Sequence, residues 1–474
     1  MNATYSHCDS PQKELSSLLY GVVGEEDLNG IDVRGSVAGL TLDSRKLNKD
    51  DLFLAIPGTH ADGRHFVSKA MDAGAKAVLF ENKNAPQECR ALERQRKAIG
   101  VADLRQQISL IAARFFDFPT REMTVVGITG TNGKTTCAYL LAQALNRLGE
   151  SAAIMGTIQS VCMEVSSHGL EQGRVNAVDF KVAVLTNLSQ DHLDYHQTMS
   201  SYAAAKQRLF NFRSLDAIVI NRDDQFGREI LDQHHECKTI SYGLEIADVT
   251  ATDCRITDSG LAFTLIYQDQ ELQIKSTLLG EINLPNILAT VSTLLALDYT
   301  PEQIAVVIPD LLPPPGRMEM FRGKQSHPRV VVDYSHTPDS LERALQSLRK
   351  SVRGRLWVVF GCGGDRDKGK RGMMGKVAVR LADHVVITND NPRFEDPHVI
   401  AAQVVEGIDE NVPASRYEII LERRDAIQHA IQNTAKDDLV LVAGKGHETT
   451  QTIGAQKSPF SDRELVREIL GGSQ

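Results

Sequence analysis

The chain has 474 residues, enough for roughly three domains that each bury a core, and its 42% hydrophobic and 24% charged residues are ordinary for a globular protein. The net charge of −9 argues against nucleic acid or an anionic membrane as a partner, so local basic residues must meet any anionic substrate. Residues 1–10 lack the apolar core of a signal peptide, and no later run approaches the roughly 18 apolar residues that span a bilayer, so we expect a cytoplasmic protein.

Residues 1–120 predict a small α/β domain, because short apolar stretches alternate with polar joints and with helical spacing. Strands are expected at 38–45 and 51–58, and helices at 66–73 and 104–116. The turn at 59–63 contains Gly and Asp, and it fits a plain surface loop as well as a ligand-binding loop.

A glycine-rich loop dominates the central part of the chain, which we place at residues 121–317. Residues 125–129 predict a buried strand, and a helix is expected to start at Lys134. A loop between such elements turns its N–H groups inward beside the positive end of a helix, so it cradles polyphosphate. Lys134 would reach the β- and γ-phosphates, and the hydroxyl of Thr135 would bind Mg²⁺. The general pattern has Gly at the position of Ile128, so a glycine turn without a nucleotide is the alternative.

Two apolar stretches after this helix, 152–156 and 161–165, predict strands that almost touch in sequence. Parallel neighbours in a sheet need a crossover of about a dozen residues or more, which this gap cannot hold. Either the two stretches form a hairpin, or one of them has left the sheet.

Several side chains near the phosphate loop are candidates for a metal site. Glu164 ends a strand at the sheet edge where ligands bind, and a carboxylate there suits Mg²⁺ across from Thr135. The strand 183–188 leads into residues 191–196, whose two His and two Asp fit a metal site or an ordinary loop equally well. Lys206 alone indicates a solvated surface lysine. Seven scattered cysteines without a Cys-x-x-Cys pair argue against disulfides and a zinc site.

The rest of the central part predicts a strand at 217–221, antiparallel strands within 249–279, and a long apolar helix that residues 283–286 cap and that continues to Leu297. Residues 313–317, which contain three prolines, predict a stiff linker.

Residues 318–474 predict a third domain with an open, mostly parallel, Rossmann-like sheet. Its five strands are expected at 330–334, 356–361, 385–388, 417–421 and 439–444. Three polar or glycine-rich loops, 361–371, 389–393 and 444–448, follow strands and should meet at one edge of the sheet, where a ligand would bind. For the first loop, a solvated basic loop is the alternative to an anion site.

Five motifs together resemble the Mur ligase family, and within it the members that add meso-diaminopimelate to UDP-N-acetylmuramoyl-L-alanyl-D-glutamate. The motifs lie at 130–136, 164–170, 187–194, 316–319 and 390–393. The resemblance covers nearly the whole chain. It implies a UDP-sugar-nucleotide domain at 1–120, a P-loop ATPase-like domain at 121–317 and an amino-acid-binding domain at 318–474, in a protein that we expect to be a monomer.

The resemblance implies a reaction with ATP and Mg²⁺, in which the γ-carboxylate of D-Glu is phosphorylated and an amine attacks the acyl phosphate. It assigns catalysis to Lys134, Glu164, His192 and Lys206. It assigns the metal to Thr135, Glu164, His192 and Lys206, the last modified to a carbamate. It assigns ATP to Gly130, Thr131, Asn132, Gly133, Lys134, Thr135, Thr136, Asn286, Arg317 and Asp333. It assigns UDP-MurNAc-dipeptide to Leu42, Ser44, Thr59, His60, Ala61, Ser166, Gln172 and Arg174, and diaminopimelate to Arg366, Asp390, Asn391, Pro392, Arg393, Gly444 and Glu448.

The choice of amino acid rests on Arg393. Diaminopimelate has a second carboxylate at its far end, which a guanidinium can hold bidentately, and family members that add lysine lack this Arg. Lysine in the pocket would leave Arg393 desolvated and unpaired, at a cost of several kcal/mol. Glu448 suits the distal ammonium.

One departure from the family lies between Ile158 and Val161, where the family carries about thirty more residues that include a substrate-binding loop and the missing crossover. We therefore weigh three functions. The first is an active diaminopimelate-adding ligase, the second is a catalytically impaired nucleotide-binding relative of it, and the third is a related ligase for another amino acid such as L-lysine.

Overall fold

The structure is a computed structural model that describes residues 11–28, 30–58, 61–153, 159–257, 260–323 and 327–471. It divides into two compact units. The first comprises Met1–Thr129, Thr157–Ala183 and Ser189–Asp216, and the second comprises Gly130–Gly156, Val184–Leu188 and Ala217–Gln474. No helix among the described residues is long and apolar enough to cross a membrane.

The N-terminal part of the first unit contains a parallel four-stranded sheet in the order β3-β4-β5-β6. Its strands are β3 (Gly39–Thr41), β4 (Asp51–Ala55), β5 (Ala77–Glu81) and β6 (Ile99–Val101), and the surrounding elements are β1 (Lys13–Glu14), α1 (Leu15–Leu19), α2 (Glu25–Leu28), β2 (Ser36–Val37), α3 (Val67–Asp72), α4 (Gln87–Arg94) and α5 (Leu104–Phe115). Successive side chains of β4 enter different cores, Leu52 and Leu54 with α1 and α5, and Phe53 with α3 and α4. The predicted small α/β domain is confirmed.

The central sheet has nine strands in the order β15-β14-β13-β12-β11-β10-β7-β9-β8. The strands are β7 (Thr124–Thr129), β8 (Ala152–Ala153), β9 (Ser160–Glu164), β10 (Val182–Leu185), β11 (Ala217–Asn221), β12 (Lys238–Tyr242), β13 (Val249–Thr257), β14 (Gly260–Tyr267) and β15 (Gln270–Ser276). The helices are α6 (Lys134–Arg147), α7 (Ser167–Glu171), α8 (Leu193–His196), α9 (Met199–Gln207), α10 (Gln225–Leu231), α11 (Leu284–Ala296) and α12 (Pro301–Val307). β9 pairs with β7 in parallel, β11 with β12 in parallel, and β13, β14 and β15 are antiparallel as predicted.

The connection between β8 and β9 is as short as the sequence indicates. Only residues 154–159 join the two strands, and 154–158 lie outside the described residues, as does most of the strand predicted at 152–156. β8 retains two residues and comes last in the strand order, next to β9. Neither strand has left the sheet.

The long helix α11 forms as predicted, but Asn283 does not cap it with its side chain. The backbone of Asn283 is already helical, with φ −88° and ψ −13°. Its Nδ2 instead donates to Leu279 O at 2.8 Å, and its Oδ1 accepts from Asn286 Nδ2 at 3.2 Å. The preceding short helix Glu281–Asn283 makes this geometry possible, because it continues directly into α11.

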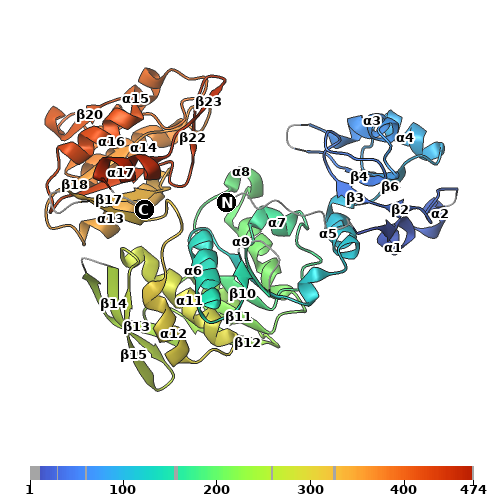
Figure 1. Cartoon of the computed structure of the whole chain (residues 1–474), viewed down its shortest axis with the longest axis horizontal. Helices are drawn as coiled ribbons and strands as arrows, with labels where there is room; N and C mark the ends of the chain where they lie inside the picture. Colours follow the sequence, from blue (N-terminus) through green and yellow to red (C-terminus); the bar gives the residue numbers. More distant parts are fainter. Residues whose placement is uncertain are drawn as a thin grey trace. The chain divides into compact units, whose positions relative to one another are not determined.

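The C-terminal part of the second unit is a Rossmann-like sheet in the order β16-β17-β21-β18-β19-β20, covered by helices on both faces (Figure 1). Its elements are β16 (Glu319–Arg322), β17 (Arg329–Asp333), α13 (Pro338–Arg349), β18 (Leu356–Phe360), α14 (Gly369–Leu381), β19 (His384–Ile387), α15 (Pro397–Val405), β20 (Tyr417–Ile419), α16 (Arg423–Gln432), β21 (Leu439–Ala443), β22 (Thr450–Ile453), β23 (Gln456–Pro459) and α17 (Asp462–Leu470). Val358 packs with α13, α14 and α15, whereas its neighbours Trp357 and Val359 pack with α16 and α17. The five predicted strands are parallel; the sequence analysis missed antiparallel β16 and the hairpin β22–β23.

Candidate functional site

The glycine-rich loop leads from β7 into α6, which begins at Lys134 as predicted. Gly133 has φ +83°, and a Cβ there would lie 2.5 Å from Asn286 Oδ1, so only glycine fits. Asn132 N donates to Asn187 Oδ1 at 2.9 Å, and Thr186 Oγ1 donates to Asn132 O at 2.6 Å. These contacts with the loop after β10 and with α11 hold the loop in shape.

Lys134 turns back over this loop. Its Nζ donates to Gly130 O at 2.9 Å and to Thr131 O at 2.8 Å, so the ammonium already lies over the loop. A polyphosphate bound by the N–H groups would compete with these carbonyl oxygens for the ammonium. The fourteen residues of α6 add the positive end of the helix dipole at the same place.

The structure brings Arg317 and Asp333 together at the linker. Met318 N donates to Asp333 Oδ1 at 2.7 Å, and the Arg317 guanidinium lies 4.6 Å from the centre of the Tyr334 ring. The Arg317 Nε is buried and has no hydrogen-bond partner in the part of the chain that the structure describes. A buried donor without an acceptor is costly, so a polar ligand is the natural partner for this Nε.

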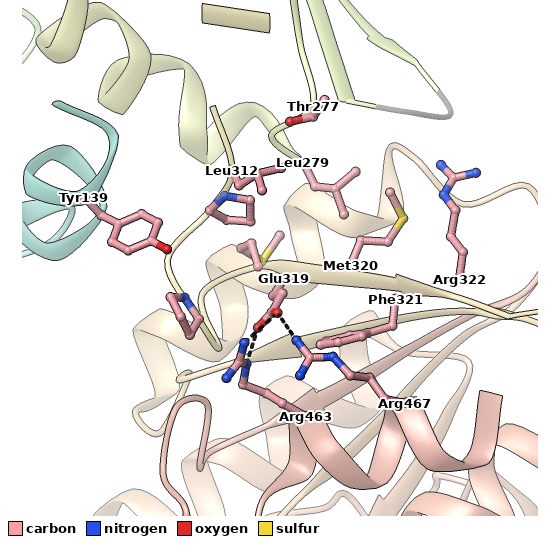
Figure 2. Close-up of a pocket in the computed structure, with 13 residues that line it drawn as sticks. Tyr139, Thr277, Leu279, Leu312, Glu319, Met320, Phe321, Arg322, Arg463 and Arg467 are labelled. Carbon is pink, nitrogen blue, oxygen red and sulfur yellow. Dashed lines mark hydrogen bonds and ion pairs between the residues drawn. The ribbon is translucent and has the colours of Figure 1, made fainter. Parts of the chain in front are cut away.

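Glu319 fixes the linker beside Arg317. Its Oε2 accepts from Gly316 N at 2.7 Å and from Arg463 Nε at 2.5 Å, and its Oε1 accepts from Arg463 Nη2 at 3.0 Å and Arg467 Nη2 at 3.3 Å. Figure 2 shows both arginines of α17 pointing at this carboxylate. These three residues line a cavity of about 570 Å³. The cavity is also lined by Tyr139, Thr277, Leu279, Leu312, Pro313, Pro315, Met318, Met320, Phe321 and Arg322. The sequence analysis missed Arg463 and Arg467, because nothing nearby in sequence indicates their partner.

In the first unit, α9 buries Lys206, contrary to the solvated lysine that its sequence context indicates. Lys206 is 1% exposed, and its Nζ lies 4.6 Å from the centre of the Tyr202 ring, one helical turn earlier. Tyr202 and Ala205 are buried too, so Lys206 belongs to the inner face of α9. The short helix gives no clear amphipathic pattern from which this face could be predicted.

His192 and Glu164 lie on different elements of the first unit. Glu164 ends β9 and pairs in register with Ile128 near the end of β7, which is the sheet edge predicted for it. His192 has φ +53°, and its N donates to Asp191 Oδ1 at 2.8 Å. Its ring lies 5.0 Å from that of His168. Among the residues that the structure describes, no group of three or more His, Cys, Asp or Glu side chains is arranged to hold a metal ion.

Three residues predicted to contact the rest of the UDP-MurNAc-dipeptide substrate, beyond its uridine part, lie next to α7: Ser166 directly before it, and Gln172 and Arg174 just after it. Ser166 caps α7 by accepting from Gly169 N at 3.0 Å. Gln172 Nε2 donates to Tyr195 OH at 3.1 Å, and Arg174 Nη2 donates to Gln172 Oε1 at 2.7 Å.

The sequence analysis missed His196, which braces this region. Its Nε2 lies 2.9 Å from Ser167 Oγ, and its Nδ1 lies 3.1 Å from Glu171 Oε2. Burial lowers the pKa of His196, and also that of His168, where the neighbouring histidines act in the same direction.

In the N-terminal part of the first unit, Leu42 follows β3 and is 52% exposed. Ser44 lies in the turn after β3, where Asp43 accepts from Arg45. Ala61 O accepts from Gly58 N at 2.9 Å, whereas Thr59 and His60 lie outside the described residues.

The three loops predicted to share one edge of the C-terminal sheet do meet there. Arg393, with φ +50°, donates through Nη1 to Gly364 O at 2.7 Å. A Cβ at Gly363 would lie 3.0 Å from Arg393 Nη1, closer than most such contacts, so the glycine makes room for Arg393, whereas Arg366 Cγ at 3.6 Å would be in ordinary contact. A Cβ at Gly444 would lie 2.7 Å from Asp390 Oδ2. The first loop is therefore packed against the loop that carries Arg393 and is not merely a solvated basic segment.

Buried ion pairs brace these loops. Arg371 is fully buried and donates to Glu395 Oε1 at 2.9 Å and to Gly363 O at 3.1 Å. The hydrogen bond from Arg371 lowers the pKa of Glu395 to about 2, and a further bond from Asp365 N acts in the same direction. Sequence reasoning did not find this pair, which joins α14 to the loop that follows β19.

Lys445 and Glu448 form a second ion pair at this edge, with Nζ and Oε2 2.8 Å apart. Burial raises the pKa of Glu448, but hydrogen bonds from Lys445 and Asn391 outweigh that effect and hold its pKa below the usual value. Asn391 Nδ2 donates to the same Oε2 at 2.9 Å. Glu448 is thereby kept as a carboxylate, which suits a cationic ligand.

Profiles of known families match three parts of the chain. "Mur ligase family, catalytic domain" matches residues 36–116, "Mur ligase middle domain" matches 155–294, and "Mur ligase, glutamate ligase domain" matches 316–446. A protein of Ectopseudomonas mendocina (strain ymp), named UDP-N-acetylmuramoyl-L-alanyl-D-glutamate--2,6-diaminopimelate ligase, is 44% identical, with 91% of this chain and 94% of the relative covered. The chain belongs to the Mur ligase family.

Other Mur ligases agree with this assignment. A relative of the same name from Pseudomonas aeruginosa (strain PAO1) is 42% identical, again with 91% of this chain and 94% of the relative covered. A solved structure of that name is 32% identical, covers 97% of this chain and 99% of its own, and has a TM-score of 0.69. MurF from Acinetobacter baumannii, 19% identical over 98% of this chain and 100% of its own with a TM-score of 0.67, shares the fold. The chain has the three-domain α/β architecture of Mur ligases.

The same alignments bear on the short connection between β8 and β9. The alignment to the E. mendocina protein is 467 positions long, whereas 91% of 474 residues is about 431, so about 36 positions have no residue in this chain. The middle-domain profile begins at residue 155, beside that connection. A shortfall of this size agrees with the segment of about thirty residues that the family resemblance predicts to be missing.

Proposed function

We propose that the chain is an ATP-dependent ligase that adds meso-diaminopimelate to the D-glutamate of UDP-MurNAc-L-Ala-D-Glu, in peptidoglycan precursor synthesis. The observation that carries the proposal is the likeness to ligases of that name, which are 41–44% identical and covered over 93–94% of their length. The charges of Arg393 and Glu448 support the same substrate. Because ATP and a UDP-linked sugar are the substrates, we place the reaction in the cytoplasm.

In this proposal the phosphates of ATP lie on residues 130–136, with Lys134 on the β- and γ-phosphates. The unpartnered Nε of Arg317 offers a donor to the nucleotide, and Asp333 and Asn286 lie beside the linker and the loop respectively. The γ-carboxylate of D-Glu attacks the γ-phosphorus of ATP, and ADP leaves. The amine of the amino acid then attacks the carbonyl carbon of the resulting acyl phosphate and gives up a proton, and the tetrahedral intermediate collapses to the amide as inorganic phosphate leaves. Cations that neutralise the crowded oxygens supply most of the catalysis.

For Mg²⁺ we propose Thr135, Glu164, His192 and Lys206 as the residues that hold it, with Lys206 carbamylated. Lys206 is buried in α9, and its carbamate would be an oxygen ligand of the kind that Mg²⁺ prefers. The metal, when bound, neutralises charge on the transferring phosphoryl group.

The uridine nucleotide and its peptide are assigned to two groups of residues. The uridine part is assigned to Leu42, Ser44, Thr59, His60 and Ala61, and the rest of the UDP-MurNAc-dipeptide is assigned to Ser166, Gln172 and Arg174. We propose domain limits at 1–120, 121–317 and 318–474. Each family profile falls within one of these domains, at 36–116, 155–294 and 316–446, except that the last profile begins two residues before the third domain.

A catalytically impaired, nucleotide-binding relative is the second candidate. The short connection between β8 and β9, only residues 154–159, favours it. In the family, the segment missing here includes a loop that touches the nucleotide-sugar substrate. Loss of a helix that covers a sheet face would also expose apolar surface. A ligase for L-lysine is the third candidate, and Arg393 disfavours it.

Phosphate release by the purified protein with ATP, Mg²⁺ and UDP-MurNAc-L-Ala-D-Glu separates the three candidates. Meso-diaminopimelate and L-lysine are supplied in parallel, and ATP binding is measured by calorimetry. Turnover with diaminopimelate alone supports the ligase proposal. ATP binding without turnover supports the impaired relative, and turnover with lysine supports the third candidate. In a chimera, the crossover segment of the P. aeruginosa relative is placed after Ile158; turnover gained only there would locate the defect in the missing segment.

A further inference from the structure

The amino group of Lys445 lies where three segments of the proposed amino-acid site meet. Lys445 has no exposed surface, and its three ammonium hydrogens face three acceptors. These are Glu448 Oε2 at 2.8 Å, Thr450 O at 2.8 Å and Asn391 Oδ1 at 3.2 Å. A buried ammonium with every donor paired is fixed in place, because any shift leaves a charged donor without an acceptor. Lys445 therefore holds the loops after β19 and β21 and the hairpin β22–β23 at fixed separations.

The side chain of Asn391 uses its whole hydrogen-bonding capacity in this network. Its Nδ2 donates to Glu448 Oε2 at 2.9 Å and to Asp390 Oδ1 at 3.1 Å. Its Oδ1 accepts from Lys445 and, at 3.0 Å, from Thr452 N. A side-chain amide has two donors and two acceptor positions, so none remains for a substrate. Asn391 can act on an amino acid only through its neighbours.

Glu448 and Arg393, which carry opposite charges, each keep polar atoms that make no hydrogen bond within the described residues. Glu448 is 32% exposed in its side chain, and its Oε1 makes no hydrogen bond within the described part of the chain. Arg393 donates through Nη1, while its Nε and Nη2 have no hydrogen-bond partner among the residues that the structure describes. A carboxylate and a guanidinium on separate loops match a ligand that carries an ammonium and a carboxylate together.

The hairpin β22–β23 links Lys445 to the backbone of Arg393. Arg393 N donates to Thr452 O at 3.1 Å, and Gly454 N donates to Arg393 O at 2.6 Å. Lys445 holds the same hairpin through Thr450 O. A shift of Lys445 would thus move Glu448 directly and Arg393 through the hairpin.

We propose that Lys445 is a positioning residue for amino-acid selectivity: it sets the separation between Glu448 and Arg393, and so favours a substrate whose far end carries both an ammonium and a carboxylate. The inference rests on the proposed function, because diaminopimelate is the amino acid with that pair of groups and L-lysine has the ammonium alone. Lys445 itself does not touch the substrate.

The test compares Lys445→Met with Lys457→Met, a matched control on the exposed strand β23. In Lys445→Met we expect the KM for diaminopimelate to rise about 10- to 100-fold, which corresponds to the loss of a charged hydrogen bond. The KM for ATP should stay within about twofold, and the ratio of kcat/KM values should shift toward L-lysine. The control should match the wild type in all three quantities.

A pH profile separates positioning from a merely structural role. Lys445 helps to keep Glu448 ionised. The wild-type KM for diaminopimelate should therefore stay constant from about pH 7 down to about pH 5.5. In Lys445→Met the KM should rise over the same range as Glu448 takes up a proton. An unchanged KM and a flat profile in the variant overturn the proposal, as does a parallel loss for diaminopimelate, L-lysine and ATP.

If Lys445→Met does not fold, Gln451→Leu on β22 tests whether the hairpin β22–β23 sets the separation between Glu448 and Arg393. Gln451 is buried, and its Nε2 donates to Asp390 O at 2.8 Å. The expected shift in selectivity has the same direction, and its absence overturns the proposal. A failure of the proposed function is seen separately, in the wild type, as neither turnover nor calorimetric binding of diaminopimelate.

Discussion

Replacing Arg393 by methionine should reduce selectivity for diaminopimelate over L-lysine. Methionine keeps most of the aliphatic stem and removes the guanidinium. Arg393 makes one strong internal hydrogen bond, to Gly364 O at 2.7 Å, so most of its donors remain for a substrate carboxylate. Removing one partner of a buried charge pair costs about 2–5 kcal/mol, and Arg393 is only half-buried, so we expect the lower part of that range, about 2–3 kcal/mol.

That range corresponds to a fall of about 30- to 150-fold in kcat/KM for diaminopimelate. For L-lysine, which has no carboxylate to lose, kcat/KM should stay constant or rise, because no guanidinium is left desolvated. Both values come from phosphate release at varied amino-acid concentration, with Arg380→Met on the surface of α14 as the control. Equal losses for the two amino acids would refute the argument, because they would show that Arg393 supports the fold and does not choose the substrate.

Three further changes test other parts of the structure. Arg423→Met leaves the fully buried Asp462 without its partner and should lower the free energy of unfolding, measured by denaturant titration, by about 3–5 kcal/mol. The double variant Arg423→Met with Asp462→Leu should recover most of that lost free energy. The folded-state pKa of Glu395, about 2, lies below its unfolded value. The stabilisation by Glu395 is therefore present above about pH 4.3 and is lost as the pH falls toward 2. The melting temperatures of the wild type and of Glu395→Gln should converge as the pH is lowered. Gly133→Ala places a Cβ 2.5 Å from Asn286 Oδ1 at positive φ and should weaken ATP binding about tenfold or more in calorimetry.

The elements that sequence reasoning predicted well are those whose signal is local. The parallel strands of the C-terminal sheet are apolar runs bounded by polar loops, and β11 and the start of α6 were predicted to the residue. Because ligand-binding loops follow the carboxyl ends of parallel strands, the sequence also predicts the sheet edges at which Glu164 and the loops around Arg393 lie.

What sequence reasoning missed depends on contacts between distant segments. Lys206 was interpreted as a solvated lysine, because only the packing of α9 decides which face is buried. The hairpin β22–β23 contains polar residues on both strands, so it lacks the alternation that predicts a strand. The partners of Glu319 lie about 144 positions away along the chain, at Arg463, where no local pattern points to them.

The measurement that tests the central claim most directly follows oxygen from substrate to product. UDP-MurNAc-L-Ala-D-Glu labelled with ¹⁸O in the γ-carboxylate is incubated with the protein, ATP, Mg²⁺ and meso-diaminopimelate, and the released phosphate and the nucleotide product are analysed by mass spectrometry. An acyl-phosphate ligase transfers one ¹⁸O to phosphate for every diaminopimelate joined, and we predict that result. Phosphate without label, or no tripeptide product from a protein that binds ATP, would contradict the account and make the chain a ligase by ancestry alone.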